Sequence, residues 1–178
     1  MAEHALNRLI ITGANGSGKS HLAARLAELR PNVPIISFDV IKLQTGWQQR
    51  PRSEITSSLH QAIKGNAWIL EGGPSLLPHA IAKADGLVWL DPSELVRAWR
   101  LAIRPWRFLG RTRPELPSGN IDWPLQQYRF ALRSLKNRAK FQSDISATFS
   151  KSGHIEKWHC RDSSDVHRVI AAWTKDTS

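Results

Sequence analysis

The stretch GANGSGKS, from Gly13 to Ser20, combines glycines, a lysine and a hydroxyl side chain in the spacing G-x-x-x-x-G-K-[ST]. Glycines let backbone N–H groups turn inward around a di- or triphosphate, and the start of a following helix adds its dipole. In this pattern Lys19 is expected to reach the β- and γ-phosphates, and the Ser20 hydroxyl is expected to ligate Mg²⁺. The spacing therefore predicts a phosphate-binding loop of the P-loop type. The predicted phosphate-binding set is Gly13, Ala14, Asn15, Gly16, Ser17, Gly18, Lys19, Ser20 and His21.

Three carboxylates, Asp39, Glu71 and Asp91, close apolar runs that are typical of buried strands. Asp39 is a candidate to ligate Mg²⁺ through water, or to act as base toward an acceptor hydroxyl. The alternative for Asp39 is a cap on the helix expected to follow it. Glu71 is favoured over Asp91 for holding Mg²⁺ or its waters, because the glycines after Glu71 allow close backbone approach. Asp91 precedes a proline and is better explained as a helix cap.

The segment RAWRLAIRPWRFLGRTR, residues 97–113, holds six arginines and no lysine. Five of them follow the 3-4 spacing of one helix face. The stripe could clamp the phosphates of a small ligand, bind a nucleic-acid backbone, or form a solvated face. Planar, bidentate clamping of phosphate oxygens favours arginine specifically, whereas a purely electrostatic grip would tolerate lysine. We favour the clamp, with Arg97 and Arg100 on a fixed part beside the nucleotide and Arg107 to Arg113 on a moving part.

Two further loops, GWQQRP (46–51) and GGPSLLP (72–78), are expected on the other side of the site. An ordinary polar loop with one anchoring tryptophan explains the first of them equally well. Trp99 and Trp106, which interleave with the arginines, could stack on bases, but their helical spacing favours packing onto neighbouring elements. The candidates for acceptor recognition are Trp47, Gln48, Arg50, Arg52, Gly72 and Gly73.

Apolar runs without alternation indicate strands that are covered on both faces, as in a parallel sheet. Helical patterns lie between these runs, so the alternation predicts an α/β, doubly wound fold with right-handed crossovers. The expected strands are 8–12, 34–39, 67–71, 86–91 and 154–160. The expected helices are 21–30, a segment from a Ser53 cap to Gly65, and 163–173 with a cap at Ser163 or Ser164.

The region from about 92 to 150 interrupts this alternation. A helix begins at DPSELVRAWRLAIR, and Pro105 is expected to kink or end it. A loop rich in proline follows, and then a second basic helix, PLQQYRFALRSLKNRAK. An insertion at the carboxyl end of a strand lies where open α/β sheets bind ligands. We therefore expect one domain over residues 1–178, with a lid at about 97–125.

The composition places limits on the class of protein. A chain of 178 residues with 41% hydrophobic content suits one globular domain. A single cysteine, Cys160, excludes an internal disulfide, and no apolar run approaches the ~18–20 residues of a bilayer span. We therefore expect a cytoplasmic protein without membrane association. Nearly all of the net charge of +10 lies between residues 97 and 140, which indicates an anionic partner.

Taken in order, GANGSGKSHLA, SFDVIKLQTGW, WILEGG, DGLVWLD and RAWRLAIRPWRFLGRTRPELPSGN resemble one family, over about residues 8–125. It is the adenylate-kinase-related P-loop kinases, often labelled FlaR-like or DNA topology modulation proteins. The resemblance implies an NMP-kinase-like parallel five-stranded sheet of order 2-3-1-4-5, use of ATP and Mg²⁺, and an arginine-bearing lid. It also implies a substrate or metal carboxylate at Asp39, and lid contacts from Arg104, Arg111 and Arg113.

The sequence departs from this family at three places. His21 stands where the family usually has threonine, which removes a hydroxyl near the α-phosphate. Glu71-Gly72-Gly73 replaces the usual Asp-Gly-Asn, and Asn120-Ile121-Asp122 replaces a common Cys-Pro-Glu pattern. The last two departures lie on the side expected to hold the acceptor, so they bear on substrate choice.

The residues together predict a kinase that transfers the γ-phosphoryl group of ATP to a small acceptor, with a nucleotide among the candidates. Lys19 and the loop amides would hold the donor, and Ser20 with Glu71 or Asp39 would hold Mg²⁺. Two alternatives stay open. One is a regulator that binds nucleic acid under nucleotide control, and the other is an ATPase without a small acceptor.

Overall fold

The computed structural model describes residues 6–107, 120, 128, 129, 132, 136–153 and 155–175. The strands are β1 (Arg8–Gly13), β2 (Ile35–Ser37), β3 (Trp68–Gly72), β4 (Gly86–Leu90) and β5 (Glu156–Cys160). The α-helices are α1 (Lys19–Leu29), α2 (Phe38–Lys42), α3 (Arg52–Ala62), α4 (Leu77–Ala80), α5 (Glu94–Arg107), α7 (Arg138–Lys151) and α8 (Ser163–Lys175). Short 3-10 turns are η1 (Thr45–Trp47), η2 (Pro74–Leu76) and η3 (Ile81–Lys83). None of the described helices is long and apolar enough to cross a bilayer.

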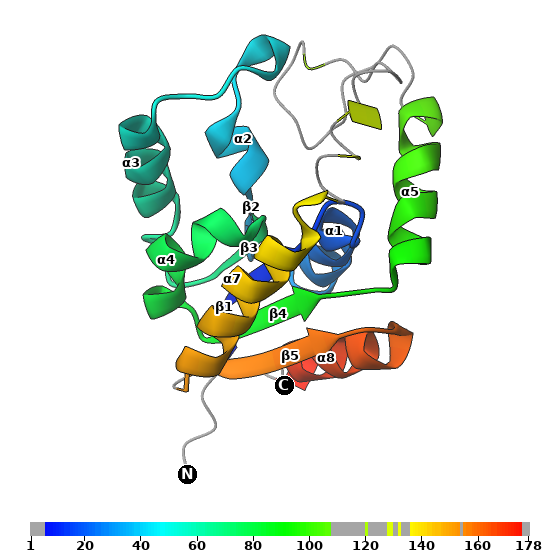
Figure 1. The fold of residues 1–178 in the computed structure, drawn as a ribbon. Coiled ribbons are helices and arrows are strands. Elements are labelled where there is room, and N and C mark those ends of the chain that lie inside the picture. Colours follow the sequence, from blue (N-terminus) through cyan, green and yellow to red (C-terminus); the bar gives the residue numbers. More distant parts are fainter. Residues whose placement is uncertain are drawn as a thin grey trace.

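The strands form one parallel sheet in the order β2-β3-β1-β4-β5, which confirms the predicted fold class (Figure 1). The central strand β1 pairs with β3 on one side and with β4 on the other, with Arg8 opposite Trp68 and Leu9 opposite Gly86. The chain leaves β1 toward β2 on one side and leaves β3 toward β4 on the other, so the direction of the connections reverses between β1 and β3. A crevice forms at the carboxyl ends of the strands at such a point. The loop that follows Gly13 begins at this crevice.

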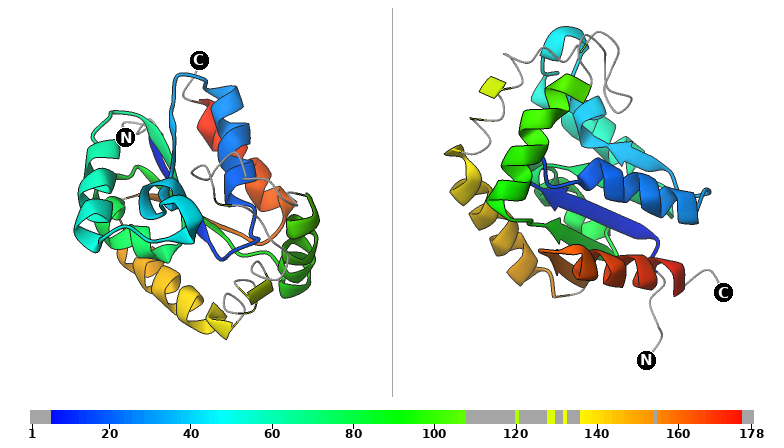
Figure 2. Two further views of the ribbon diagram at one scale, coloured as in Figure 1. Left: turned by 90° about the horizontal axis from the view of Figure 1, so that it is seen from above. Right: turned by 90° about the vertical axis from the view of Figure 1, so that its right-hand side faces the viewer.

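Helices cover both faces of the sheet, as the unbroken apolar strands predicted (Figure 2). Alternate side chains of β1 divide between two cores: Ile10 belongs to one, and Leu9 and Ile11 belong to the other. The first core is completed by α3, α4 and α7, and the second by α1 and α8. The second core includes Trp173 of α8, whose indole Nε1 donates to Leu26 O of α1 at 3.0 Å. This bond joins the helix after the phosphate loop to the last helix of the fold.

Several helix boundaries differ from the sequence predictions. Strand β2 ends at Ser37, so Asp39 lies in the first turn of α2 and not at a strand end. Helix α3 starts at Arg52 after Pro51, one residue before the predicted cap. Helix α8 is capped by Asp162, whose Oδ1 accepts the Ser164 N–H at 2.8 Å and the Asp165 N–H at 3.1 Å. Asp162 therefore takes the capping role that was predicted for Ser163 or Ser164, and its charge strengthens the hydrogen bonds from the free N–H groups of the first turn.

The region after β4 differs most from the predictions. Helix α5 (Glu94–Arg107) includes Pro105, so the proline does not end the helix at the preceding residue. The predicted loop after this helix and most of the second basic helix lie outside the described residues. A helix over Arg138–Lys151, α7, extends well past the predicted end at Lys140, and its Ile145 is buried in the first core.

Candidate nucleotide site

The phosphate loop joins β1 to α1 in a conformation that requires glycine. Gly16 has φ 79 and Gly18 has φ 103, in the left-handed region that side chains disfavour. At Gly13 a Cβ would lie 2.5 Å from the Leu90 carbonyl oxygen of the neighbouring strand. Lys19 is the first residue of α1, and its Nζ donates to Ala14 O at 3.2 Å. The lysine therefore folds back over the loop, where a bound polyphosphate would meet its ammonium group.

Glu71 lies at the centre of the polar contacts beside this loop. Its carboxylate accepts the Ser37 hydroxyl at 2.7 Å and the Ser20 hydroxyl at 3.3 Å. Burial raises the pKa of Glu71, although the charge of Lys19 and the Ser37 hydrogen bond act to lower it. Asp39 adds a second negative charge that also raises this pKa. A buried carboxylate that is costly to ionise gains free energy from a cation beside it.

The donor set at this point fits Mg²⁺. Mg²⁺ prefers oxygen ligands, keeps several waters, and is usually held by one or two protein oxygens together with substrate phosphates. The structure brings Ser20 Oγ and the Glu71 carboxylate together beside Lys19 and Asp39, which is the pairing that the predicted metal site needs. Among the described residues no cluster of three or more His, Cys, Asp or Glu side chains could hold a metal by protein ligands alone.

Asp39 lies at the edge of the site. Its Oδ1 is 3.7 Å from Lys42 Nζ, one turn further along α2, and its side chain is 47% exposed. The position still lines the same cavity as the phosphate loop and Glu71.

A cavity of about 1000 Å³ opens over the phosphate loop, at the upper end of the volumes that hold small ligands. One wall comes from α5 and a second from the turn between β5 and α8. Its lining outside the phosphate loop includes Arg25, Asp39, Glu71, Val96, Trp99, Arg100, Ile103, Cys160, Arg161, Asp162, Ser163, Val166 and His167. Sequence reasoning missed Arg25 and the β5–α8 residues, although the carboxyl end of β5 was a signal for them.

Trp99 lies on the α5 wall of this cavity and is 68% exposed. Trp106 is 63% exposed, and its indole Nε1 donates to the Tyr128 hydroxyl at 2.8 Å. The sequence prediction that both rings pack onto neighbouring elements is therefore wrong for Trp99. An aromatic face open to a nucleotide-sized cavity can stack on a base.

The first two arginines of the stripe contact the phosphate loop itself. Arg97 is 2% exposed, and its Nε donates to Asn15 O at 3.3 Å. Arg100 lines the cavity, and its Nη1 donates to Ser17 O at 3.0 Å. Both arginines therefore lie beside the loop, but Arg97 does not line the cavity. The side chains of Arg104, Arg111 and Arg113 lie outside the described residues, so their lid contacts stay a prediction.

The residues predicted to recognise the acceptor lie in different local environments. Trp47 has φ 62 and follows Gly46, and its backbone N–H donates to Asn120 Oδ1 at 2.5 Å. Gly72 is packed against Phe38, whereas nothing lies within 4 Å of a Cβ built at Gly73.

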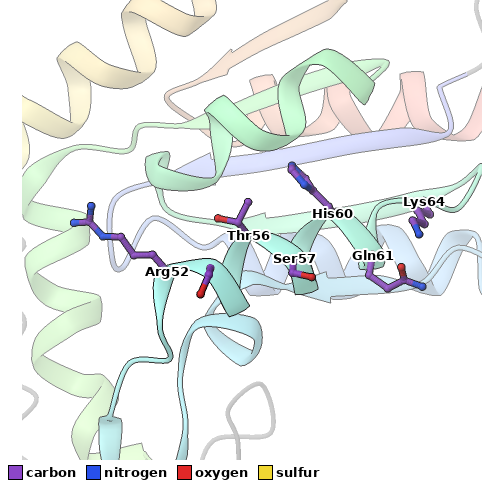
Figure 3. Close-up of a pocket in the computed structure, with 7 residues that line it drawn as sticks. Arg52, Thr56, Ser57, His60, Gln61 and Lys64 are labelled. Carbon is purple, nitrogen blue, oxygen red and sulfur yellow. The ribbon is translucent and has the colours of Figure 1, made fainter.

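Arg52 lies apart from the phosphate loop, at one end of a row of polar side chains on α3 (Figure 3). These side chains line a shallow hollow of about 610 Å³ on the outer surface. The hollow is lined by Arg52, Ser53, Thr56, Ser57, His60, Gln61 and Lys64. All of these residues lie on α3 except Lys64, which follows the helix, and none of them belongs to the phosphate loop.

Asp91 contacts β5 and α7 and does not line the cavity over the phosphate loop. Its carboxylate lies 3.2 Å from His159 Nε2 and accepts from Gln142 Nε2 at 3.3 Å. The His159 ring stacks on Trp89 with centroids 4.0 Å apart. Asp91 thus ties the ends of β4 and β5 to α7. The predicted helix cap at Asp91 is replaced by this cluster, because the side chain is already engaged there.

The fold resembles that of a solved enzyme. The 1.7 Å crystal structure of shikimate kinase from Bacteroides thetaiotaomicron aligns with this chain at a TM-score of 0.52 and 20% sequence identity. The alignment covers 95% of this chain and 97% of that chain. No model of a protein family matches the sequence, and no curated protein matches it either. The chain has the P-loop, NMP-kinase-like fold.

Proposed function

We propose that this protein is an ATP-dependent kinase that transfers the γ-phosphoryl group to a small acceptor. The observation that carries the proposal is the meeting of four groups in one cavity. The phosphate loop, Lys19, and the Ser20–Glu71 pair all line the cavity over the carboxyl edge of a kinase-like sheet. We include membership of the FlaR-like group in this proposal, on the motifs that the sequence shares with it.

The loop N–H groups and the Lys19 ammonium would hold the phosphates of ATP and orient the γ-phosphorus toward the acceptor. Ser20 and Glu71 would hold Mg²⁺, which neutralises phosphate charge when it is bound with the nucleotide. The acceptor oxygen forms a bond to the γ-phosphorus while the bond from that phosphorus to the bridging oxygen of ADP breaks. Asp39 would take the proton that the acceptor hydroxyl releases.

The donor base would lie between the α5 wall and the β5–α8 turn. Val96, Trp99 and Ile103 supply apolar surface on one side of the cavity. The predicted lid at about residues 97–125, with Arg104, Arg111 and Arg113, would close over the transferred phosphate and exclude water. Exclusion of water would direct the phosphoryl group to the acceptor and limit hydrolysis.

The test is a screen of Mg·ATP against nucleotides, sugars and small hydroxyacids, with ADP production as the readout. Lys19→Ala should abolish acceptor-dependent ADP production, because it removes the ammonium group from the phosphate site. Lys83→Ala, an exposed lysine on η3, is the matched control and should behave like the wild type. If no acceptor raises ADP production above the Lys19→Ala level, the kinase proposal fails.

The nucleic-acid alternative has a separate test. Arg97 is buried, so it is not open to a nucleic-acid backbone. A DNA-binding surface would therefore rely on the other cations between residues 97 and 140. Titration of duplex DNA across salt concentrations should show only weak binding if the kinase proposal holds. A steep log–log slope, at about −0.9 per phosphate neutralised, would favour the regulator.

A further inference from the structure

Helix α5 lies against the outer side of the phosphate loop and touches three consecutive carbonyl groups there. Arg97 Nε donates to Asn15 O at 3.3 Å. Arg100 Nη1 donates to Ser17 O at 3.0 Å and lies 3.5 Å from Gly16 O, a longer and weaker contact. The contacts join residues more than 80 positions apart in the chain. Two guanidinium groups therefore occupy the carbonyl side of the loop.

Close packing supports these hydrogen bonds. A Cβ at Gly16 would lie 3.0 Å from Leu101 Cγ and 3.2 Å from Arg97 O, and a Cβ at Gly18 would lie 3.2 Å from Arg100 Nη1. The loop glycines thus allow α5 to approach the loop backbone directly. The second and third glycines of the motif have a role toward α5 as well as toward a ligand.

The orientation of the carbonyls decides where the amides point. In a trans peptide the carbonyl of one residue and the N–H of the next point in opposite directions, and the described residues contain no cis peptide. Holding Asn15 O and Ser17 O toward α5 therefore directs the N–H groups of Gly16 and Gly18 away from it. Both glycines line the cavity, where inward N–H groups form an anion-binding nest.

We propose that Arg97 and Arg100 are positioning residues that hold the phosphate loop in its anion-binding conformation by fixing its outward carbonyls. The inference rests on the proposed nucleotide site. It places these two side chains on the carbonyl side of the loop, opposite the phosphates. It also accounts for arginine at these positions. A planar guanidinium donates in several directions at once, whereas a lysine ammonium acts as a single point. Their two positive charges behind the loop further favour a bound anion.

The experiment measures binding of ADP and of inorganic pyrophosphate by calorimetric titration without Mg²⁺. Pyrophosphate tests the phosphate nest alone, because it has no base or ribose. Arg97→Met should weaken the binding of ADP and of pyrophosphate by a similar factor. If the loop then holds its binding conformation about one tenth of the time, the apparent Kd rises about tenfold. Arg97→Lys, which keeps the charge and N–H donors but not the planar guanidinium, should fall between Arg97→Met and the wild type.

Arg97 does not line the cavity, and Arg97→Lys keeps its positive charge, so weaker pyrophosphate binding in Arg97→Lys must act through the loop. Arg100→Met tests the second contact on an exposed side chain and keeps the proposal falsifiable if the Arg97 variants do not fold. Ile145→Ala, in the core on the opposite face, is the stability control. It should lower the melting temperature and leave both Kd values unchanged in titrations at 10 °C or below.

The outcomes separate this inference from the proposed function. If the wild-type protein binds neither ADP nor pyrophosphate, the proposed function and this inference fail together. If it binds both ligands and the Arg97→Met and Arg100→Met variants bind them with wild-type Kd, the positioning role fails and the nucleotide site stands. Loss of ADP binding with wild-type pyrophosphate binding would also overturn the inference, since it would place the arginines at the base and not at the loop.

Discussion

Gly72 and Gly73 are neighbours in the chain with opposite surroundings, and alanine at each position should change stability in opposite directions. A Cβ at Gly72 would lie 2.6 Å from Phe38 Cβ and 2.7 Å from Leu76 Cδ2. A Cβ at Gly73 would meet nothing within 4 Å, and the backbone there, with φ −77 and ψ 172, is open to any residue. The sequence alone grouped both glycines as acceptor-side residues.

The magnitudes follow from these distances. Ordinary van der Waals contact begins at 3.4 Å, so Gly72→Ala must displace two buried side chains. Overpacking of this kind costs about 1–3 kcal/mol. Alanine at a strain-free glycine position stabilises by about 0.4–1 kcal/mol, because it restricts the unfolded chain. At about 2–4 °C per kcal/mol for a domain of this size, Gly72→Ala should lower the melting temperature by about 2–12 °C and Gly73→Ala should raise it by about 1–4 °C.

Differential scanning calorimetry of the two variants beside the wild type checks the signs, and urea denaturation checks the free energies. A Gly72→Ala protein that melts at the wild-type temperature would refute the packing described at the end of β3. The same pair tests the acceptor prediction. If the backbone at Gly73 contacts an acceptor, Gly73→Ala should lower kcat/KM for that acceptor while the Kd for ADP stays unchanged.

Three further predictions follow from individual side chains. Glu71→Gln should stabilise the free protein at pH 7, because burial raises the pKa of Glu71 above its ordinary 4.5 and its ionisation therefore lowers stability as the pH rises past that value. The urea midpoints of the wild type and of Glu71→Gln should converge near pH 4. If Glu71→Gln were less stable than the wild type at pH 7, this would contradict the expected cost of the buried charge. Burial also acts to raise the pKa of Asp85, but the hydrogen bonds from Arg8 outweigh it and hold this pKa below 3.8. The stability that wild type has over Asp85→Asn should be complete at pH 7 and shrink as the pH falls below 3.8, and a constant difference in urea denaturation would rule this out. Burial raises the pKa of the Cys160 thiol to about 12, so a disulfide reagent at pH 7 should label it only after unfolding, and fast labelling of the native protein would exclude a buried thiol.

The sequence predicted the features that depend on neighbouring residues or on the apolar pattern. The phosphate loop could be predicted because its glycines, Lys19 and Ser20 all lie within one short stretch. The sheet could be predicted because its central strands are buried on both faces and so appear as unbroken apolar runs. The sequence placed the end of the second strand at Asp39, past its true end at Ser37, because the apolar run continues through Phe38, which begins α2.

Contacts between distant parts of the chain could not be predicted in the same way. The helical spacing of Arg97 indicates its face on α5, but not that this face meets Asn15, 82 residues earlier. Helix α7 did carry a signal, since Phe141, Ile145 and Phe149 recur every four residues. Interspersed serines weaken that pattern, because they favour turns and caps over helix interiors. A helix of this kind is stabilised mainly by the core it covers, which the sequence does not display.

The central position of β1 has a consequence for the order in which the protein can assemble during synthesis. Leu9 pairs with Ile69 and with Gly86, so the first strand of the chain gains both neighbours only after β4 has been made. Until then β1 can pair only with β3, and its other edge has no neighbouring strand. Such non-local pairing slows folding and leaves apolar surface exposed to aggregation. A ribosome-bound chain that stops short of Leu90 should therefore be protease-sensitive throughout, with protection appearing in one late step.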